Sequence, residues 1–249
     1  MRAYEYRSIY AEDVRYVARY SDDPIWPPRV RAYGGPTEPT HFETAAKFAR
    51  AAVRLMIPVS LLLVLLGSAF LHADDFLPLQ WAPGSFRSAG LAIGDLILPG
   101  CWYCVLLTNR RYGPGYALAH LLAATVVALA VIAFNPGGID QWAMTMPAIT
   151  GRAVLSFGAA FVSANFVGIT VFDAARGPRW WMAPLVGSIA ASYVFSAIYF
   201  PAAFAGVYER WPDSATAHLV VFTGMSVVLL VPYWLLRPAM RPIDGLNGY

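Results

Sequence analysis

The feature of this chain that most limits its fold is a series of long apolar segments separated by short polar ones. A helix needs about twenty apolar residues to cross the hydrocarbon core of a bilayer. Charged residues make up 13% of the chain, about half of their share in soluble domains. The sequence therefore predicts an all-α polytopic membrane protein with six transmembrane helices, at residues 51–71, 89–108, 115–134, 149–172, 180–203 and 217–236.

The positions of the arginines predict how these helices are oriented. Basic residues collect in the cytoplasmic loops of membrane proteins. Arginines are frequent in the N-terminal segment, in the loops after the second and fourth apolar segments, and in the C-terminal tail, whereas the other three loops carry acidic residues. We therefore expect six spans with both chain ends in the cytoplasm.

The polarity of the chain divides it into three parts. Residues 1–48 are rich in Tyr, Arg, Asp, Glu and Pro and are predicted to form a cytoplasmic N-terminal extension. The six-helix transmembrane domain covers residues 49–240, and a cytoplasmic tail covers residues 241–249. Tyr, Trp and Arg are enriched at protein interfaces. The extension is therefore a candidate element for docking to a larger membrane-protein complex.

Two charged residues near the predicted outer surface suggest a polar site. Arg152 lies close to the start of the fourth segment, and Asp95 is expected at a similar depth in the second. One hypothesis is that Arg152 reaches the outer headgroups, because a charge near a helix end costs less than at the bilayer centre. The alternative is that Arg152 and Asp95 pair with each other or flank a polar ligand. At about 100° per residue, the face of Arg152 also carries Ser156, Ala159, Ser163, Phe166 and Thr170.

A second polar line runs along the fifth segment. Its members are Ser188, Ser192, Ser196 and Tyr199. Small residues at four-residue spacing also allow membrane helices to pack closely, so each line fits either a solute cavity or a packing surface. If a cavity is present, the residues predicted to line it are Asp95, Arg152, Asn165, Ser192 and Tyr199.

The remaining reactive side chains do not predict catalysis. Cys101 and Cys104 form a C-x-x-C pair inside a predicted span, without a second pair or a histidine cluster, and are interpreted as buried thiols. The histidines are far apart in sequence, and His120, inside a span, is either a packing residue or a proton relay. We expect no enzyme activity, no cofactor, no metal and no nucleic-acid partner.

Several motifs between residues 89 and 240 are similar to a known family. They are the stretch from Arg152 to Asp173, the run VFDAARGPRWWMAP at 171–184, the run VVLLVPYWLLRPAMR at 227–241, and LPG and LLTN at 98–100 and 106–109 before Tyr112-Gly113. This pattern resembles the Vut-type queuosine precursor transporters. The resemblance implies a six-helix protein of the bacterial inner membrane, similar in architecture to the S components of energy-coupling-factor vitamin transporters.

The resemblance also implies roles for particular residues. Arg152 stands at the family's fourth-helix arginine, and Asn165 stands at its glutamine. Most of the family's ionisable positions are replaced, by Asn109, Gly168, Phe195 and Phe222, and Ser192 stands at its fifth-helix asparagine.

Two functions follow as alternatives. The first is a carrier for a small polar solute of the 7-deazapurine or vitamin type, working by alternating access without ATP. The second is a non-transporting structural or assembly subunit of a membrane complex. Polar groups converging between the second, fourth and fifth helices favour the carrier, and apolar side chains filling that space favour the subunit.

Overall fold

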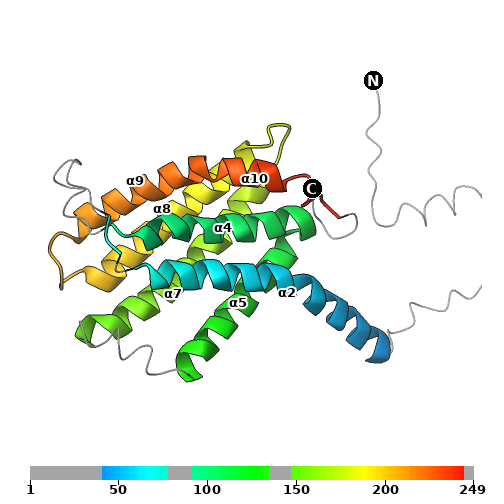
Figure 1. Cartoon of the computed structure of the whole chain (residues 1–249), viewed down its shortest axis with the longest axis horizontal. Coiled ribbons are helices and arrows are strands. Elements are labelled where there is room, and N and C mark those ends of the chain that lie inside the picture. Colours follow the sequence, from blue (N-terminus) through cyan, green and yellow to red (C-terminus); the bar gives the residue numbers. More distant parts are fainter. Residues whose placement is uncertain (1–40, 74, 78–90, 135–146, 244–249) are drawn as a thin grey trace, which may run out of the picture. The chain divides into compact units, whose positions relative to one another are not determined.

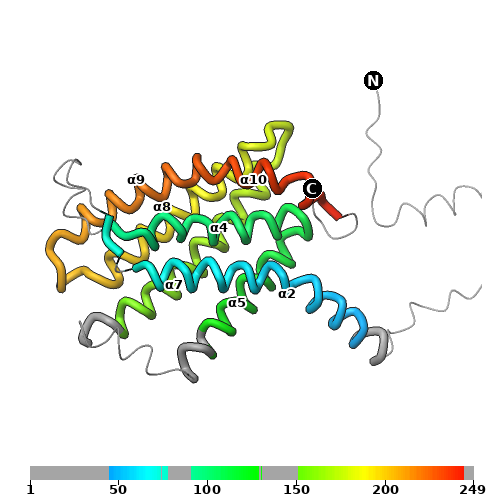
Figure 2. Tube along the Cα trace, viewed as in Figure 1, coloured from blue at the N-terminus to red at the C-terminus, as the bar shows by residue number. Residues whose placement is uncertain are grey.

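The structure is a computed structural model that describes residues 41–73, 75–77, 91–134 and 147–243. The chain divides into two compact units, Met1–Phe48 and Ala49–Tyr249. Figure 2 traces the backbone, coloured from the N-terminus to the C-terminus. Residues 1–40 of the predicted extension and residues 244–249 of the predicted tail lie outside the described residues.

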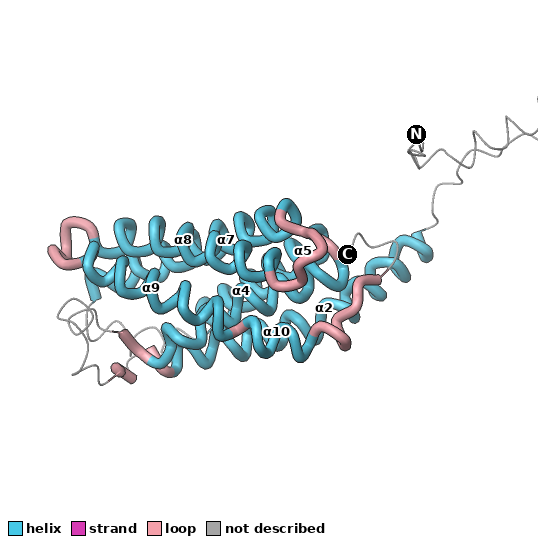
Figure 3. Tube along the Cα trace, turned by 90° about the horizontal axis from the view of Figure 1, so that it is seen from above, coloured by secondary structure: helices cyan, strands magenta, loops and turns pink. Residues whose placement is uncertain are grey.

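All six predicted spans fall on helices of the structure (Figure 1). In the described ranges the only β-type pairing is an isolated bridge between Phe76 and Ala92, and helices joined by loops make up the rest (Figure 3). The all-α prediction is confirmed for this part of the chain. The helices are α2 (His41–Leu71), α4 (Ile93–Tyr112), α5 (Pro114–Phe134), α7 (Pro147–Ala174), α8 (Met182–Phe204), α9 (Trp211–Val228) and α10 (Leu230–Leu236).

Among the described residues, four stretches are long and apolar enough to cross a membrane, which makes this a multi-pass helical membrane protein. Their mean hydropathies are 2.1, 1.8, 1.5 and 2.2, in the order Ala45–Leu71, Gly151–Ala174, Met182–Phe204 and Trp211–Leu236. The described apolar part of α5 is shorter, and α4 carries charged residues near both of its ends. The fifth and sixth spans, and the orientation, stay predictions.

Glycine and proline set two of the helix boundaries. Gly113 ends α4 with a φ of 85°, a conformation that glycine adopts without strain. Pro114 then begins α5, where its missing N–H is not needed. Pro232 removes the N–H that would bond to Val228, the last residue of α9. The sixth predicted segment is therefore divided into α9 and α10.

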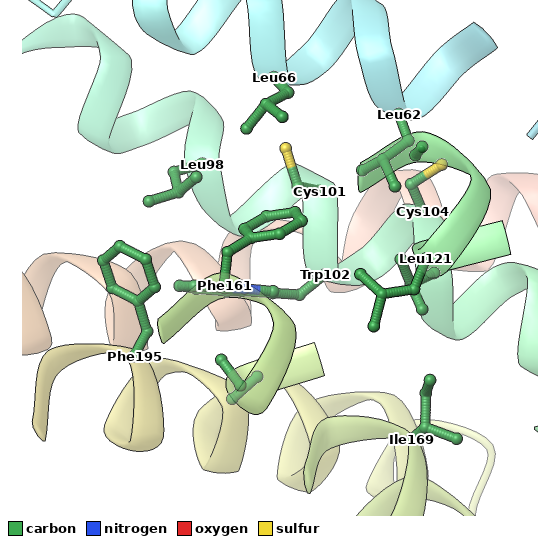
Figure 4. Packing of buried hydrophobic residues seen from close by; sticks show 14 of the residues in the cluster. Leu62, Leu66, Leu98, Cys101, Trp102, Cys104, Leu121, Phe161, Ile169 and Phe195 are labelled. Atoms are coloured by element: carbon green, nitrogen blue, oxygen red, sulfur yellow. The ribbon is translucent and has the colours of Figure 1, made fainter. Parts of the chain in front are cut away.

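Helix α4 forms the centre of the second unit. It packs against α5, α7, α8 and α9, and every residue from Cys101 to Asn109 is buried. A helix that is apolar on all sides is suited to such a position. Figure 4 shows Leu62 and Leu66 of α2 on one side of α4, with Phe161 of α7 and Phe195 of α8 on the other.

Glycines let two pairs of helices approach closely. A Cβ added to Gly94 of α4 would collide with the carbonyl oxygen of Ala69 in α2. A Cβ on Gly187 of α8 would lie 3.0 Å from the carbonyl oxygen of Gly168 in α7. Close backbone approach at small residues is how membrane helices gain packing contacts. These contacts support the packing interpretation of the small residues in α7 and α8.

Candidate functional site

Asp95 and His218 form the main polar pair at one end of the bundle, called here the Asp95 end. Asp95 lies in the first turn of α4, where its Oδ2 accepts a hydrogen bond from the N–H of Ala92 at 2.8 Å. Nε2 of His218, in α9, lies 3.1 Å from the same Oδ2. The side chains of Asp95 and His218 are 22% and 10% exposed, so a carboxyl and an imidazole are held largely out of solvent.

The geometry requires a proton within this pair. Nδ1 of His218 lies 2.7 Å from the carbonyl oxygen of Ser214, which only accepts hydrogen bonds, so Nδ1 carries a hydrogen. A neutral ring with that tautomer presents a lone pair at Nε2, which does not bond to an ionised carboxylate. The 3.1 Å contact with Asp95 therefore needs a further proton, on the imidazole or on the carboxyl.

Arg152 has a different partner from the one considered in the sequence analysis. Its Nε donates to the carbonyl oxygen of Ala202 at 2.5 Å, and its Nη2 lies 3.5 Å from that of Pro201. Both carbonyls belong to the last turn of α8, where the oxygen of Pro201 also accepts a hydrogen bond from the N–H of the capping residue Ala205. A cation also interacts favourably with the negative end of a helix dipole. Arg152 thus joins the start of α7 to the end of α8, while Asp95 pairs with His218.

The face of α7 that carries Arg152 does not line an interior cavity. Arg152, Ala159, Phe166 and Thr170 are all exposed in the second unit, and Phe166 is 55% exposed. Ser156 of the same face is buried. Most of this face is therefore available to lipid or to another protein rather than to an enclosed solute.

Aromatic side chains fill the space between α4, α7, α8 and α9. The Trp102 ring lies 6.0 Å from that of Phe195 and 5.4 Å from that of Phe222, measured between centroids. Phe157 packs edge-on against Phe195 at 5.4 Å. Ring pairs at 4.5–7 Å are favourable contacts. Trp102, Phe195 and Phe222 are each 1% exposed, so the centre of this unit is a packed core.

Tyr199 extends this aromatic cluster toward the Asp95 end. Its ring stacks on Phe195 at 5.2 Å and meets the edge of Phe157 at 5.9 Å. The ring of Phe200, next in the chain, lies 5.2 Å from that of Tyr199 and 4.8 Å from that of His218. Of the predicted site residues, Tyr199 and Asp95 therefore lie toward the same end of the bundle, with Phe200 and His218 between them.

Asn165 and Ser192 are buried, and their side chains form hydrogen bonds within their own helices. Nδ2 of Asn165 donates to the carbonyl oxygen of Phe161, one turn earlier. The hydroxyl of Ser192 donates to the carbonyl oxygen of Ser188, also one turn earlier. Such bonds to the preceding turn are a common way to bury polar side chains in helices. These two residues take up packing positions in α7 and α8, and neither has a hydrogen-bond partner from another helix in the part of the chain that the structure describes.

Ser188 and Ser226 connect α8 to α9 inside the core. Their hydroxyl oxygens lie 2.7 Å apart, and the hydroxyl of Tyr103 in α4 donates to the carbonyl oxygen of Ser226 at 2.5 Å. All three residues are buried. Hydrogen bonds between membrane helices are worth about 1–2 kcal/mol or less each. The serine line of α8 therefore contributes to helix association.

A second polar cluster lies at the other end of α4, called here the Asn109 end. Nδ2 of Asn109 donates to Oδ1 of Asp173 in α7 at 3.0 Å. Arg176 bonds to the same Oδ1 through Nε at 2.8 Å, and its Nη2 lies 3.2 Å from Oδ1 of Asn109. Asn109 is 0% exposed. Because a buried amide must find partners, this triad fixes the end of α4 against the end of α7.

The cysteines and His120 show no sign of chemistry. Cys101 and Cys104 are free and buried, in agreement with their interpretation as inert thiols. Both ring nitrogens of His120 are buried without a hydrogen-bond partner among the described groups. In the described ranges, no group of three His, Cys, Asp or Glu residues is placed to hold a metal ion.

Two polar contacts of the structure were not predicted from the sequence. His218 was treated as isolated, although its predicted position at the start of the sixth span placed it at the depth of Asp95. That shared depth was the available signal. The Asn109 triad had a weaker signal, because Asp173 and Arg176 are three residues apart, a spacing that pairs charges on a helix.

The comparisons add no assignment to this geometry. Comparison with known protein families, with curated proteins and with solved structures finds no match to the chain.

Proposed function

We propose that this chain is a non-transporting helical subunit of a membrane-protein complex. The observation that supports the proposal is the aromatic core around Trp102, Phe195 and Phe222, which occupies the space where a carrier would need its solute cavity. Ligand sites are concave, with polar groups that converge on the ligand. In this chain the central polar side chains Asn165 and Ser192 bond within their own helices instead.

The proposed orientation of the chain in its membrane follows from the distribution of the arginines. The Asn109 end carries basic residues of the α4–α5 turn, the α7–α8 loop and the C-terminal turn, and we place it in the cytoplasm of a bacterial inner membrane. The chain then has six spans with both termini on the cytoplasmic side. Residues 1–48, rich in Tyr and Arg, are the proposed docking element.

Purification from native membranes tests this proposal. The tagged full chain, extracted in a mild detergent, is expected to co-purify with other membrane proteins in fixed stoichiometry, measured by mass spectrometry. The matched variant lacks residues 1–40 and is expected to enter the membrane but to lose these partners. Recovery of the full chain as a single species would contradict the proposal.

A small-solute carrier is the second candidate, because one observation favours it. Asp95 and His218 are in contact at 3.1 Å, and their side chains are largely withdrawn from solvent. A buried ionisable pair in a membrane protein is a recognised mark of transport sites. The solute class implied by the family resemblance is a 7-deazapurine. A rise in the melting temperature of the purified full chain on adding 7-deazaguanine precursors, lost in Asp95→Asn, would support the carrier.

A further inference from the structure

An open cleft of about 410 Å³ lies at the Asn109 end, between the end of α4 and the turn after α10. Three of the residues that line it are arginines, and the other three are apolar. They are Arg110, Arg237, Arg241, Trp234, Leu235 and Pro238. No acidic residue is among the described residues that line the cleft. The lining of the cleft thus combines positive charge with apolar side chains.

Arg110 of the cleft differs from two nearby arginines in the hydrogen bonds that its guanidinium group forms. Arg111 donates to the carbonyl oxygen of Ala239 at 2.6 Å, and Arg176 is paired with Asp173. In contrast, Nε of Arg110 is buried without a hydrogen-bond partner in the described part of the chain. A buried charged donor without an acceptor is costly. An anion bound in the cleft would stabilise the charge of this guanidinium group without touching Nε.

The cleft also lies at the expected surface of the bilayer. The apolar stretch formed by α9 and α10 ends at Leu236, and Arg237 follows directly. Trp234 and Leu235, on the apolar side of this boundary, are 54% and 63% exposed. Tryptophan and arginine at the end of a span belong to the headgroup region. The apolar wall therefore faces acyl chains while the guanidinium groups face headgroups.

We propose that this cleft binds the phosphate group of an anionic phospholipid. Arginine presents several donors in a plane that matches phosphate oxygens, and basic pockets at the ends of membrane helices bind anionic headgroups. Arg237 and Arg241 contact the phosphate, and Trp234 and Leu235 contact the first part of the acyl chains. The inference rests on the multi-pass character of the protein and not on its proposed function.

The test compares two double variants of the full chain by native mass spectrometry in detergent. Arg237→Gln with Arg241→Gln changes the cleft, whereas Arg179→Gln with Arg210→Gln removes the same charge from exposed positions elsewhere. Each arginine near anionic headgroups contributes about fivefold in affinity. Phosphatidylglycerol is expected to bind the cleft variant about 25-fold more weakly than the wild type, and to bind the control variant unchanged.

Three outcomes would overturn the proposal. They are an equal loss in both double variants, equal binding of phosphatidylcholine, and binding of inorganic phosphate alone as tightly as the lipid. The last result would indicate a site for a free anion. Circular dichroism checks that the variants fold. If Arg237→Gln does not fold, the exposed Arg241→Gln alone is expected to weaken phosphatidylglycerol binding about fivefold, and an unchanged affinity would contradict the inference.

Discussion

Trp102→Ala is expected to lower the free energy of unfolding by about 3–5 kcal/mol, the range measured for large aromatic residues truncated in packed cores. Trp102 is 1% exposed, and its ring contacts Phe195 and Phe222. Its removal leaves a void that rigid neighbouring helices fill only in part. Unfolding by titration with a denaturing detergent, followed by circular dichroism, measures the change.

Trp234→Ala is the matched control for this experiment. Trp234 is 54% exposed, so the same truncation removes few protein contacts there and is expected to change the unfolding free energy by less than about 1 kcal/mol. If Trp102→Ala proves as mild as the control, the space around Trp102 is not a tightly packed core. That result would remove the main support for a non-transporting subunit.

Gly94→Ala is expected to separate α2 from α4 and to cost about 3 kcal/mol or more, because the added methyl group meets backbone rather than a movable side chain. Its Cβ would collide with the carbonyl oxygen of Ala69. The N–H of Gly94 also donates to the carbonyl oxygen of His72 at 3.0 Å, which holds the two backbones together. The melting temperature in detergent measures the loss.

Gly158→Ala provides the control for the glycine variant. Gly158 lies inside α7, and nothing lies within 4 Å of a Cβ built there. Alanine is the better helix former by about 1 kcal/mol, so this variant is expected to be neutral or slightly stabilised. A similar loss of stability in both variants would show that helix propensity, and not close approach, governs Gly94.

The helices could be predicted from the sequence because membrane spans leave a strong local signal. Apolar runs of about twenty residues have few alternatives to a helix in a bilayer, where every backbone group must be satisfied internally. The predicted helix boundaries were wrong by a few residues, for reasons found at particular glycines and prolines. Gly113 and Pro114 bring the ends of α4 and α5 closer than expected, and Pro232 divides the last segment at Leu229.

The contacts between helices were less predictable. Helical periodicity shows which residues share a face of one helix, but not which neighbour that face meets. Arg152 and Asp95 were both placed near the outer surface, yet Arg152 binds α8 and Asp95 binds His218 of α9. Ser192 and Asn165 had polar side chains, but their bonds to the preceding turn are not visible in a residue pattern.

Two features of the molecule favour different functions. The aromatic core around Trp102 favours a packed subunit. The contact between the ionisable side chains of Asp95 and His218 favours a transport role. The first concerns the middle of the membrane, where a carrier must open a path, and the second concerns the Asp95 end alone. The accessibility of the middle to water therefore decides between them.

Thiol labelling of a single buried position measures this accessibility most directly. Ser192→Cys places a thiol at a residue that is 0% exposed, and Thr216→Cys provides an exposed reference. The wild type, with Cys101 and Cys104 buried, gives the background. The packed core predicts labelling of Ser192→Cys by a water-soluble reagent at least about a hundredfold slower than the reference, since labelling needs a local opening. Labelling at the reference rate would contradict the packed core and support a solute path.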